Sequence, residues 1–126
     1  VKAAVALAPA TQVKDHSGVT VPTLVVACQS DAFAPPRAHA DRIYETVPAS
    51  VSKALMELKG SSACTNTSAP ALQREKVARY VTAWLKRFVD QDCRYSPFLC
   101  GAEHEAAISS AVSPQVVTRY KQNCPY

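Results

Sequence analysis

The chain has 126 residues, of which 48% are hydrophobic and 19% charged, and its 14 lysines and arginines against 10 acidic residues give a net charge of +4. This length suffices for one compact domain with a modest core, and no apolar run approaches the roughly 20 residues of a membrane span. The basic residues concentrate in 74–87 without the interleaved aromatics that stack on bases. The composition therefore indicates neither a membrane protein nor a nucleic-acid-binding one.

Three short apolar runs predict buried strands. Residues 2–8 (KAAVALA) and 22–28 (PTLVVAC) are apolar, partly β-branched and bounded by turn residues, and residues 53–58 (KALMEL) alternate less cleanly. The first run begins at residue 2 of a chain that has no initiator methionine. Because an apolar parallel strand requires neighbours on both sides, we expect the sheet to continue in a longer protein.

Two helices are predicted around the third strand. Residues 36–47 have apolar side chains near helical spacing, with Pro36 just inside the start and Pro48 at the end. Within residues 70–91, apolar side chains recur at i, i+3, i+4, i+7, i+8 and i+11, the pattern of an amphipathic helix. These six are Val77, Tyr80, Val81, Trp84, Leu85 and Phe88, of which Trp84 and Phe88 are expected to anchor the core.

The order of strands and helices predicts an α/β fold. Strands alternating with helices form a mostly parallel sheet flanked by helices, and here they are followed by a cysteine-bearing tail. There are five cysteines, none in a C-x-x-C pair or beside a histidine at metal-ligand spacing, so no metal site is expected. Disulfides formed in an oxidising compartment fit better, which predicts a secreted or periplasmic protein. The odd count leaves one cysteine free or paired between chains.

A carboxylate follows the strand 22–28. Asp31 lies three residues beyond the end of this strand, where ligand-binding and catalytic residues of open α/β sheets are found. A carboxylate at this position is well placed to orient the histidine of a Ser-His-acid triad. The alternative is a structural role, since most aspartates in such loops are turn or helix-cap residues.

Four segments together resemble a known family. VPTLVVACQSDAFAPP, KALMELKGSSAC, YVTAWLKRFVDQDCRYSPFLC and the closing NCPY, in this order and spacing, are similar to the cutinase-like polyester hydrolases. These are bacterial α/β-hydrolases that include enzymes degrading poly(ethylene terephthalate). The resemblance extends over nearly the whole chain and covers roughly the C-terminal half of such an enzyme. It implies that residues 1–126 are the C-terminal portion of a single α/β-hydrolase domain that uses no cofactor.

The resemblance also implies roles for individual residues. Asp31 matches the triad acid, and Phe33 matches an apolar residue that lines the ester-binding cleft. Ala10 stands where the family often has a tryptophan, so one aromatic wall of that cleft is missing, and His39 matches a non-catalytic position beside it. The substrate implied for an enzyme completed by an N-terminal portion is a polyester or a short acyl ester.

Two disulfides are implied by the same resemblance. Cys100 and Cys124 match the C-terminal disulfide of the family. Cys28 and Cys64 match a second disulfide, present in a subset, that joins the acid-bearing loop to the histidine-bearing loop. Cys93 is left over and is expected to be a free, partly packed thiol.

Two catalytic groups of the family are absent. There is no G-x-S-x-G nucleophile motif, and in the family this serine precedes the acid, so it would lie upstream of Val1. The family's histidine loop reads Gly, a small residue, Ser, His, one further residue and Cys. The chain reads GSSAC from Gly60 to Cys64, so Ser62 or a gap occupies the place of the histidine. A serine cannot act as a general base near neutral pH.

The remaining histidines are poor substitutes for the missing base. His16 and His104 are expected to be solvated loop residues, and His39 is expected to lie about two helical turns beyond Asp31. Two hypotheses follow. The chain is either the acid-bearing part of a secreted serine ester hydrolase, inactive alone, or a non-catalytic disulfide-stapled domain. The second would act through a partner or through self-association, because an exposed sheet edge recruits strands.

Overall fold

The structure is a computed structural model that describes residues 1–109 and 115–126. In this part of the chain, four strands form one sheet in the order β1 (Ala4–Leu7), β2 (Thr23–Cys28), β3 (Lys53–Leu58) and β4 (Val117–Gln122). The first three are parallel and β4 is antiparallel to β3, which confirms the mostly parallel sheet. Every residue of β2 and β3 is buried, as is typical of parallel strands covered on both faces.

The fourth strand corrects the prediction of a three-stranded sheet. β4 lies in the segment that was expected to be only a tail, and its sequence, VTRYKQ, is too polar to predict a buried strand. Its polar side chains are stabilised by partners instead. Arg119 Nη2 lies 2.9 Å from Asp41 Oδ1 and 2.7 Å from Glu57 Oε2, which joins the strand to both the neighbouring helix and β3.

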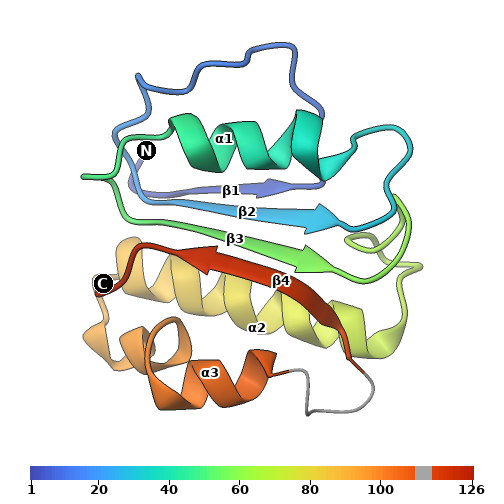
Figure 1. Cartoon of the computed structure of the whole chain (residues 1–126). Helices are drawn as coiled ribbons and strands as arrows, with labels where there is room; N and C mark the ends of the chain where they lie inside the picture. The colour runs from blue at the N-terminus through green and yellow to red at the C-terminus, as the bar shows by residue number, and fades with distance from the viewer. Residues whose placement is uncertain (110–114) are drawn as a thin grey trace.

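One face of the sheet is covered by α1 (Ala40–Thr46), as Figure 1 shows. Ile43 packs there on Val25 and Leu55. The predicted helix over 36–47 is interrupted: a 3₁₀ turn, η1 (Pro36–Ala38), precedes α1, and His39 lies between them outside helical geometry. α1 ends two residues before Pro48, as a proline stop predicts.

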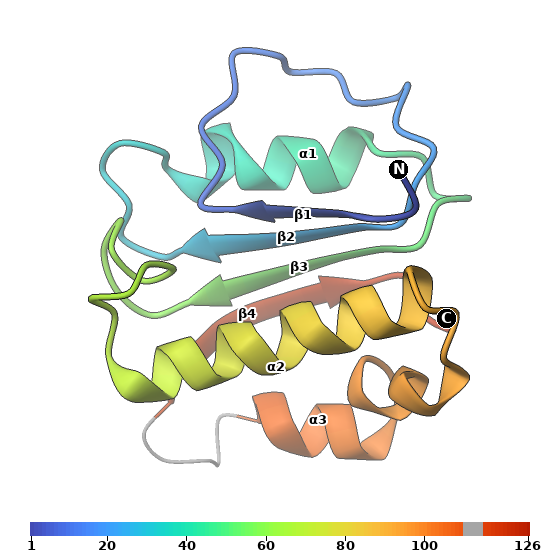
Figure 2. The ribbon, with the colours of Figure 1, turned by 180° about the vertical axis from the view of Figure 1, so that it is seen from behind.

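The opposite face is covered by the long helix α2 (Ala71–Phe88), seen in front of the sheet in Figure 2. Tyr80 and Trp84 are fully buried against the sheet, so Trp84 is a core anchor as predicted, whereas Phe88 is only partly buried. Leu85 was expected in the same stripe but is 39% exposed. It lies about 80° around the helix from Val77, beyond the width that the sheet covers.

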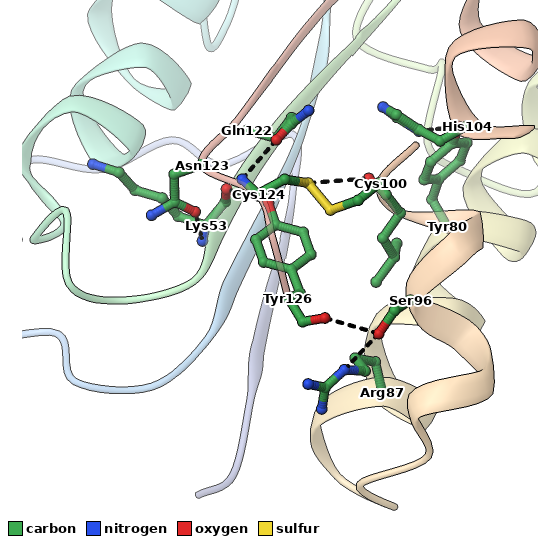
Figure 3. The surroundings of a disulfide bond; sticks show 11 residues. Lys53, Tyr80, Arg87, Ser96, Cys100, His104, Gln122, Asn123, Cys124 and Tyr126 are labelled. Carbon is green, nitrogen blue, oxygen red and sulfur yellow. Dashed lines mark hydrogen bonds between the residues drawn. A yellow bond between two sulfur atoms is a disulfide. The ribbon is translucent and has the colours of Figure 1, made fainter. Parts of the chain in front are cut away.

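The C-terminal segment closes over α2 and β3. It forms η2 (Cys93–Phe98), α3 (Ala102–Ile108) and then β4, with α3 on the outer side of α2 in both ribbon views. Cys100 and Cys124 form a disulfide with Cα atoms 6.1 Å apart. Figure 3 shows the contacts around it: Tyr126 donates its hydroxyl to the Lys53 carbonyl at 2.7 Å, and Ser96 donates to the Tyr126 carbonyl at 2.9 Å.

Candidate active site

The loops that follow β2 and β3 are joined side by side. Cys28 and Cys64 form a disulfide with Cα atoms 5.8 Å apart, and both cysteines are buried. The amides of Gln29 and Ser30 continue the ladder by donating to the carbonyls of Leu58, at 2.8 Å, and Gly60, at 2.9 Å. This is the carboxyl edge of the parallel strands, where open α/β sheets bind ligands. The two disulfides are the pairings that the family resemblance implies.

Asp31 is held rigidly in the first of these loops. Its side chain is 6% exposed, and Oδ1 accepts hydrogen bonds of 2.9 Å from the amides of both Phe33 and Ala34. These bonds form an Asx turn, so the carboxylate has the structural role that was the alternative interpretation. Among the described residues, Oδ2 has no hydrogen-bond partner. One oxygen therefore fixes the loop, and the other remains available to a donor such as an imidazole N–H.

The second loop, after β3, is fixed by a glycine and by hydrogen bonds. Gly60 has φ +118°, a conformation that favours glycine, and a Cβ atom there would lie 3.3 Å from Gln73 Nε2. Gln73, near the start of α2, is buried and donates its side-chain amide to the Lys59 carbonyl. The Cys64 amide closes a turn on the Ser61 carbonyl at 3.0 Å. Ser62 lies inside this turn and is half-buried.

The three histidines lie elsewhere in the described part of the chain. His39 Nδ1 accepts a hydrogen bond of 3.0 Å from the Thr11 amide. His16 is half-buried and has its Nδ1 3.1 Å from Thr46 Oγ1. The expectation that His104 is solvated is wrong: it is fully buried under α3, a helix that the sequence pattern does not predict. The carboxylate of Asp31 thus has no imidazole partner within residues 1–109 and 115–126.

Two large apolar side chains, one at the end of β1 and one after β2, are exposed. Phe33 is 86% exposed although it is the large side chain of the acid-bearing loop. Leu7, at the end of β1, is 46% exposed and lines a groove of about 290 Å³ together with Val77 and Val81 of α2 and with residues 65–67. Phe33 and Leu7 are thus large apolar side chains that the described residues leave exposed.

The remaining chemistry is limited in the described residues. The five cysteines all lie within them, and Cys93 is the one without a disulfide partner; it is exposed, not partly packed as expected. No group of three His, Cys, Asp or Glu side chains there could hold a metal ion. No helix in residues 1–109 or 115–126 is long and apolar enough to cross a membrane.

A mostly parallel sheet with helices on both faces and a buried aspartate after its second strand defines a partial α/β-hydrolase fold. A family model described as "PETase: PET hydrolase-like" matches residues 1–125. The chain belongs to this PET hydrolase-like family.

Similar proteins include cutinases. Cutinase 1 of Thermobifida cellulosilytica and a cutinase of Thermobifida fusca (strain YX) are each 38% identical over 125 residues, 99% of this chain but 44% and 38% of those proteins. A bis(hydroxyethyl) terephthalate hydrolase of Streptomyces coelicolor is 33% identical over 125 residues, 36% of its length. The chain thus spans well under half the length of these relatives.

Proposed function

We propose that this chain is the acid-bearing C-terminal portion of a carboxylic ester hydrolase, and that it does not hydrolyse esters alone. The observation that carries the proposal is the geometry of Asp31: one carboxylate oxygen is fixed by two backbone amides, and the other is open beside a disulfide-tied loop. A carboxylate held in this way can orient an imidazole and stabilise the imidazolium that forms during acyl transfer.

The chain alone is inactive in this proposal because it lacks a serine nucleophile and a histidine base. A triad needs a serine nucleophile and a histidine base within hydrogen-bond reach of each other. In this proposal the serine comes from an N-terminal portion, and the histidine position, at about Ser62, is vacant. Phe33 lines the acyl-binding cleft that forms when the N-terminal portion packs on this chain. The names of the relatives, cutinase and bis(hydroxyethyl) terephthalate hydrolase, support polyesters or short acyl esters as the substrate class.

The place where an N-terminal portion packs is the free edge of β1. β1 pairs with β2 on one side only, and its residues are partly buried or exposed, unlike those of β2 and β3. A further parallel strand beside β1 and a helix in the groove at Leu7 and Val81 would bury this surface. Two disulfides support a secreted protein, because such bonds persist in oxidising compartments.

A second candidate function is non-catalytic. The vacant histidine position and the unpaired β1 edge both favour a disulfide-stapled domain that associates with itself or with a partner. The two candidates differ in solution mass. Self-association by strand pairing at β1 predicts that the isolated chain sediments as a dimer. The ester-hydrolase candidate does not require a dimer, because its β1 edge pairs with an N-terminal portion of the same protein. A strict monomer therefore counts against self-association through the exposed edge of β1.

The test of the first candidate is an esterase assay on the isolated chain. We expect no hydrolysis of a p-nitrophenyl acyl ester above the buffer rate, and no difference between the chain and its Asp31→Asn variant. Turnover that persists in Asp31→Asn would remove Asp31 from the mechanism. Turnover that disappears in His39→Ala would instead assign the base to His39.

A further inference from the structure

The short helix α3 has one fully buried side chain, and it is a histidine. Of its seven residues, all within the described part of the chain, His104 is the one that is fully buried, at 0% exposure. Ala107 and Ile108 are partly buried, and the other four are exposed. Most helices of this kind are anchored by aliphatic or aromatic side chains, whose burial does not depend on pH. The anchor of α3 is a titratable group.

The cavity that holds His104 is aromatic. Its Nδ1 lies 2.9 Å from the Tyr80 hydroxyl, and its ring contacts the rings of Tyr80 and Tyr120 with centroids 5.6 and 4.5 Å away. Figure 3 shows His104 and Tyr80 together, beside the disulfide of Cys100. Within the described residues, His104 Nε2 and the Tyr120 hydroxyl are buried without a hydrogen-bond partner. The ring has one hydrogen bond in a low-dielectric environment, which suits a neutral imidazole.

The surrounding charges do not compensate an imidazolium. Burial lowers the pKa of His104, Arg79 on α2 lowers it further, and Glu105 on α3 opposes the shift. Burial also raises the pKa of Tyr80 to about 12 and raises that of Tyr120, so both phenols stay neutral. No carboxylate among the described residues contacts the ring, so protonation places an unpaired charge in an aromatic cavity.

The other ionisable groups near α3 have partners other than the imidazole. Lys76 donates from Nζ to the Ala107 carbonyl at 2.9 Å, and Glu103 lies 3.3 Å from Arg79 Nη2 at the surface. η2 contributes Tyr95, which lines the side of α2 near Arg79. On β4, Arg119 and Lys121 face the opposite side of the sheet, toward Asp41 of α1.

Without the imidazole, α3 keeps the Lys76–Ala107 hydrogen bond, the partly buried Ile108 and one exposed ion pair. An exposed ion pair such as Glu103–Arg79 holds a helix only weakly. The disulfide of Cys100 fixes the residue just before α3, and Gly101 between them has φ +101°. The disulfide therefore keeps Cys100 in place when α3 leaves the surface of α2 and β4.

We propose that α3 is an acid-released cap: the neutral His104 side chain holds it on α2 and β4, and protonation of the imidazole frees it. Release exposes Tyr80 and Tyr120 and removes Ile108 from one wall of a pocket of about 190 Å³ that Lys76 and Val117 also line. The device is independent of ester hydrolysis, since none of its groups lies in the loops that carry Asp31 and Ser62.

The experiment is hydrogen exchange of the unaltered chain, followed by mass spectrometry at about pH 7.5 and about pH 5 and corrected for the intrinsic pH dependence of exchange. We expect amide protection in α3 to fall by about tenfold or more at the lower pH, while β2 and β3 keep theirs. A histidine-resolved NMR titration of the same chain should show His104 titrating below 6.5, the ordinary pKa of a histidine.

The matched variant is His104→Gln, which can still bond to Tyr80 but does not titrate, with His16→Gln as the control. We expect the protection of α3 in His104→Gln to be independent of pH, and His16→Gln to behave like the unaltered chain. If α3 is unprotected in His104→Gln at both pH values, the comparison of the two pH values in the unaltered chain still tests the proposal. An α3 that stays protected at the lower pH, an α3 unprotected at both, or a His104 whose pKa is not below 6.5 overturns the proposal.

Discussion

Two parts of the fold each bury one polar group of the kind that a catalytic triad uses. The loop pair, residues 29–35 and 59–66, contains the carboxylate of Asp31 but no imidazole. The segment under α3, formed by His104, Tyr80 and Tyr120, contains an imidazole but no carboxylate. The first holds a carboxylate with one free oxygen and no imidazole nearby. The second holds a buried imidazole whose hydrogen-bond partner is the phenol of Tyr80, not a carboxylate. A carboxylate stabilises the imidazolium, whereas burial beside a phenol disfavours it. The comparison shows that the surroundings of a histidine, not its presence, decide whether it can act as a base.

The largest expected effect comes from removing the disulfide of the loop pair. Loop entropy gives a contribution of about 4 kcal/mol for a bridge of this span. We expect the double variant Cys28→Ser, Cys64→Ser to lose most of that amount in urea unfolding. Cys93→Ser is the matched control and should change stability by less than about 0.5 kcal/mol, because the residue is exposed. Equal losses in both would contradict the assigned pairing.

The structural role of the carboxylate is tested by two substitutions of Asp31. Asp31→Ala leaves the amides of Phe33 and Ala34 without their acceptor and should cost about 2–3 kcal/mol in unfolding free energy. Asp31→Asn keeps a neutral acceptor and should cost about 1 kcal/mol. If alanine and asparagine are equally harmless, Oδ1 does not fix the loop and the contrast with the segment under α3 loses its basis.

The stability that His104 contributes should depend on pH. The folded state lowers the pKa of His104 from 6.5, so the unfolded chain takes up the proton first as the pH falls. The contribution of His104 to stability is therefore complete above about pH 6.5 and decreases below it, by at most about 1.4 kcal/mol per pH unit. We expect the unfolding free energy of the unaltered chain to fall more steeply below that pH than that of His104→Gln. Parallel profiles for the two would contradict the assignment.

The smallest effect is expected for the partner of the imidazole. Tyr80→Phe removes the hydroxyl that contacts His104 Nδ1 but keeps the buried ring, so it should cost about 1 kcal/mol at neutral pH. The measurement is urea unfolding at a pH where His104 is neutral. A change below the error of the measurement would mean that the aromatic contacts alone hold α3.

The parts of the fold that the sequence predicts are those whose signal is local. β2, β3 and α2 have apolar patterns that match their burial, so their positions follow from periodicity. β4 and α3 do not, because their stability comes from tertiary partners: the half-buried Arg119 pairs with Asp41 and Glu57, and His104 is buried against α2 and β4. When the partner of a buried or half-buried polar residue is distant in the sequence, the residues around it show no pattern that predicts its burial.

The candidate site shows the same division. The position of Asp31 after its strand follows from topology, and the vacant histidine position proposed at Ser62 is inferred from the order of residues between Gly60 and Cys64. That Asp31 divides its two oxygens between an Asx turn and an open position depends on the backbone of Phe33 and Ala34, which no residue pattern specifies. The only local signal for the burial of His104 is its isolation among alanines and glutamates, and this signal does not specify the rings that surround it.

The central claim is that the loop pair lacks only its imidazole and its serine-bearing portion. The direct measurement is esterase activity of a hybrid that joins the N-terminal portion of the Thermobifida cellulosilytica cutinase to this chain, with one histidine inserted between Ser62 and Ala63. General-base catalysis predicts a rate about 10²-fold or more above that of the same hybrid with one alanine inserted, and loss of the gain in Asp31→Asn. Equal rates for the histidine and alanine insertions in a folded hybrid, or a gain that survives Asp31→Asn, would contradict the account.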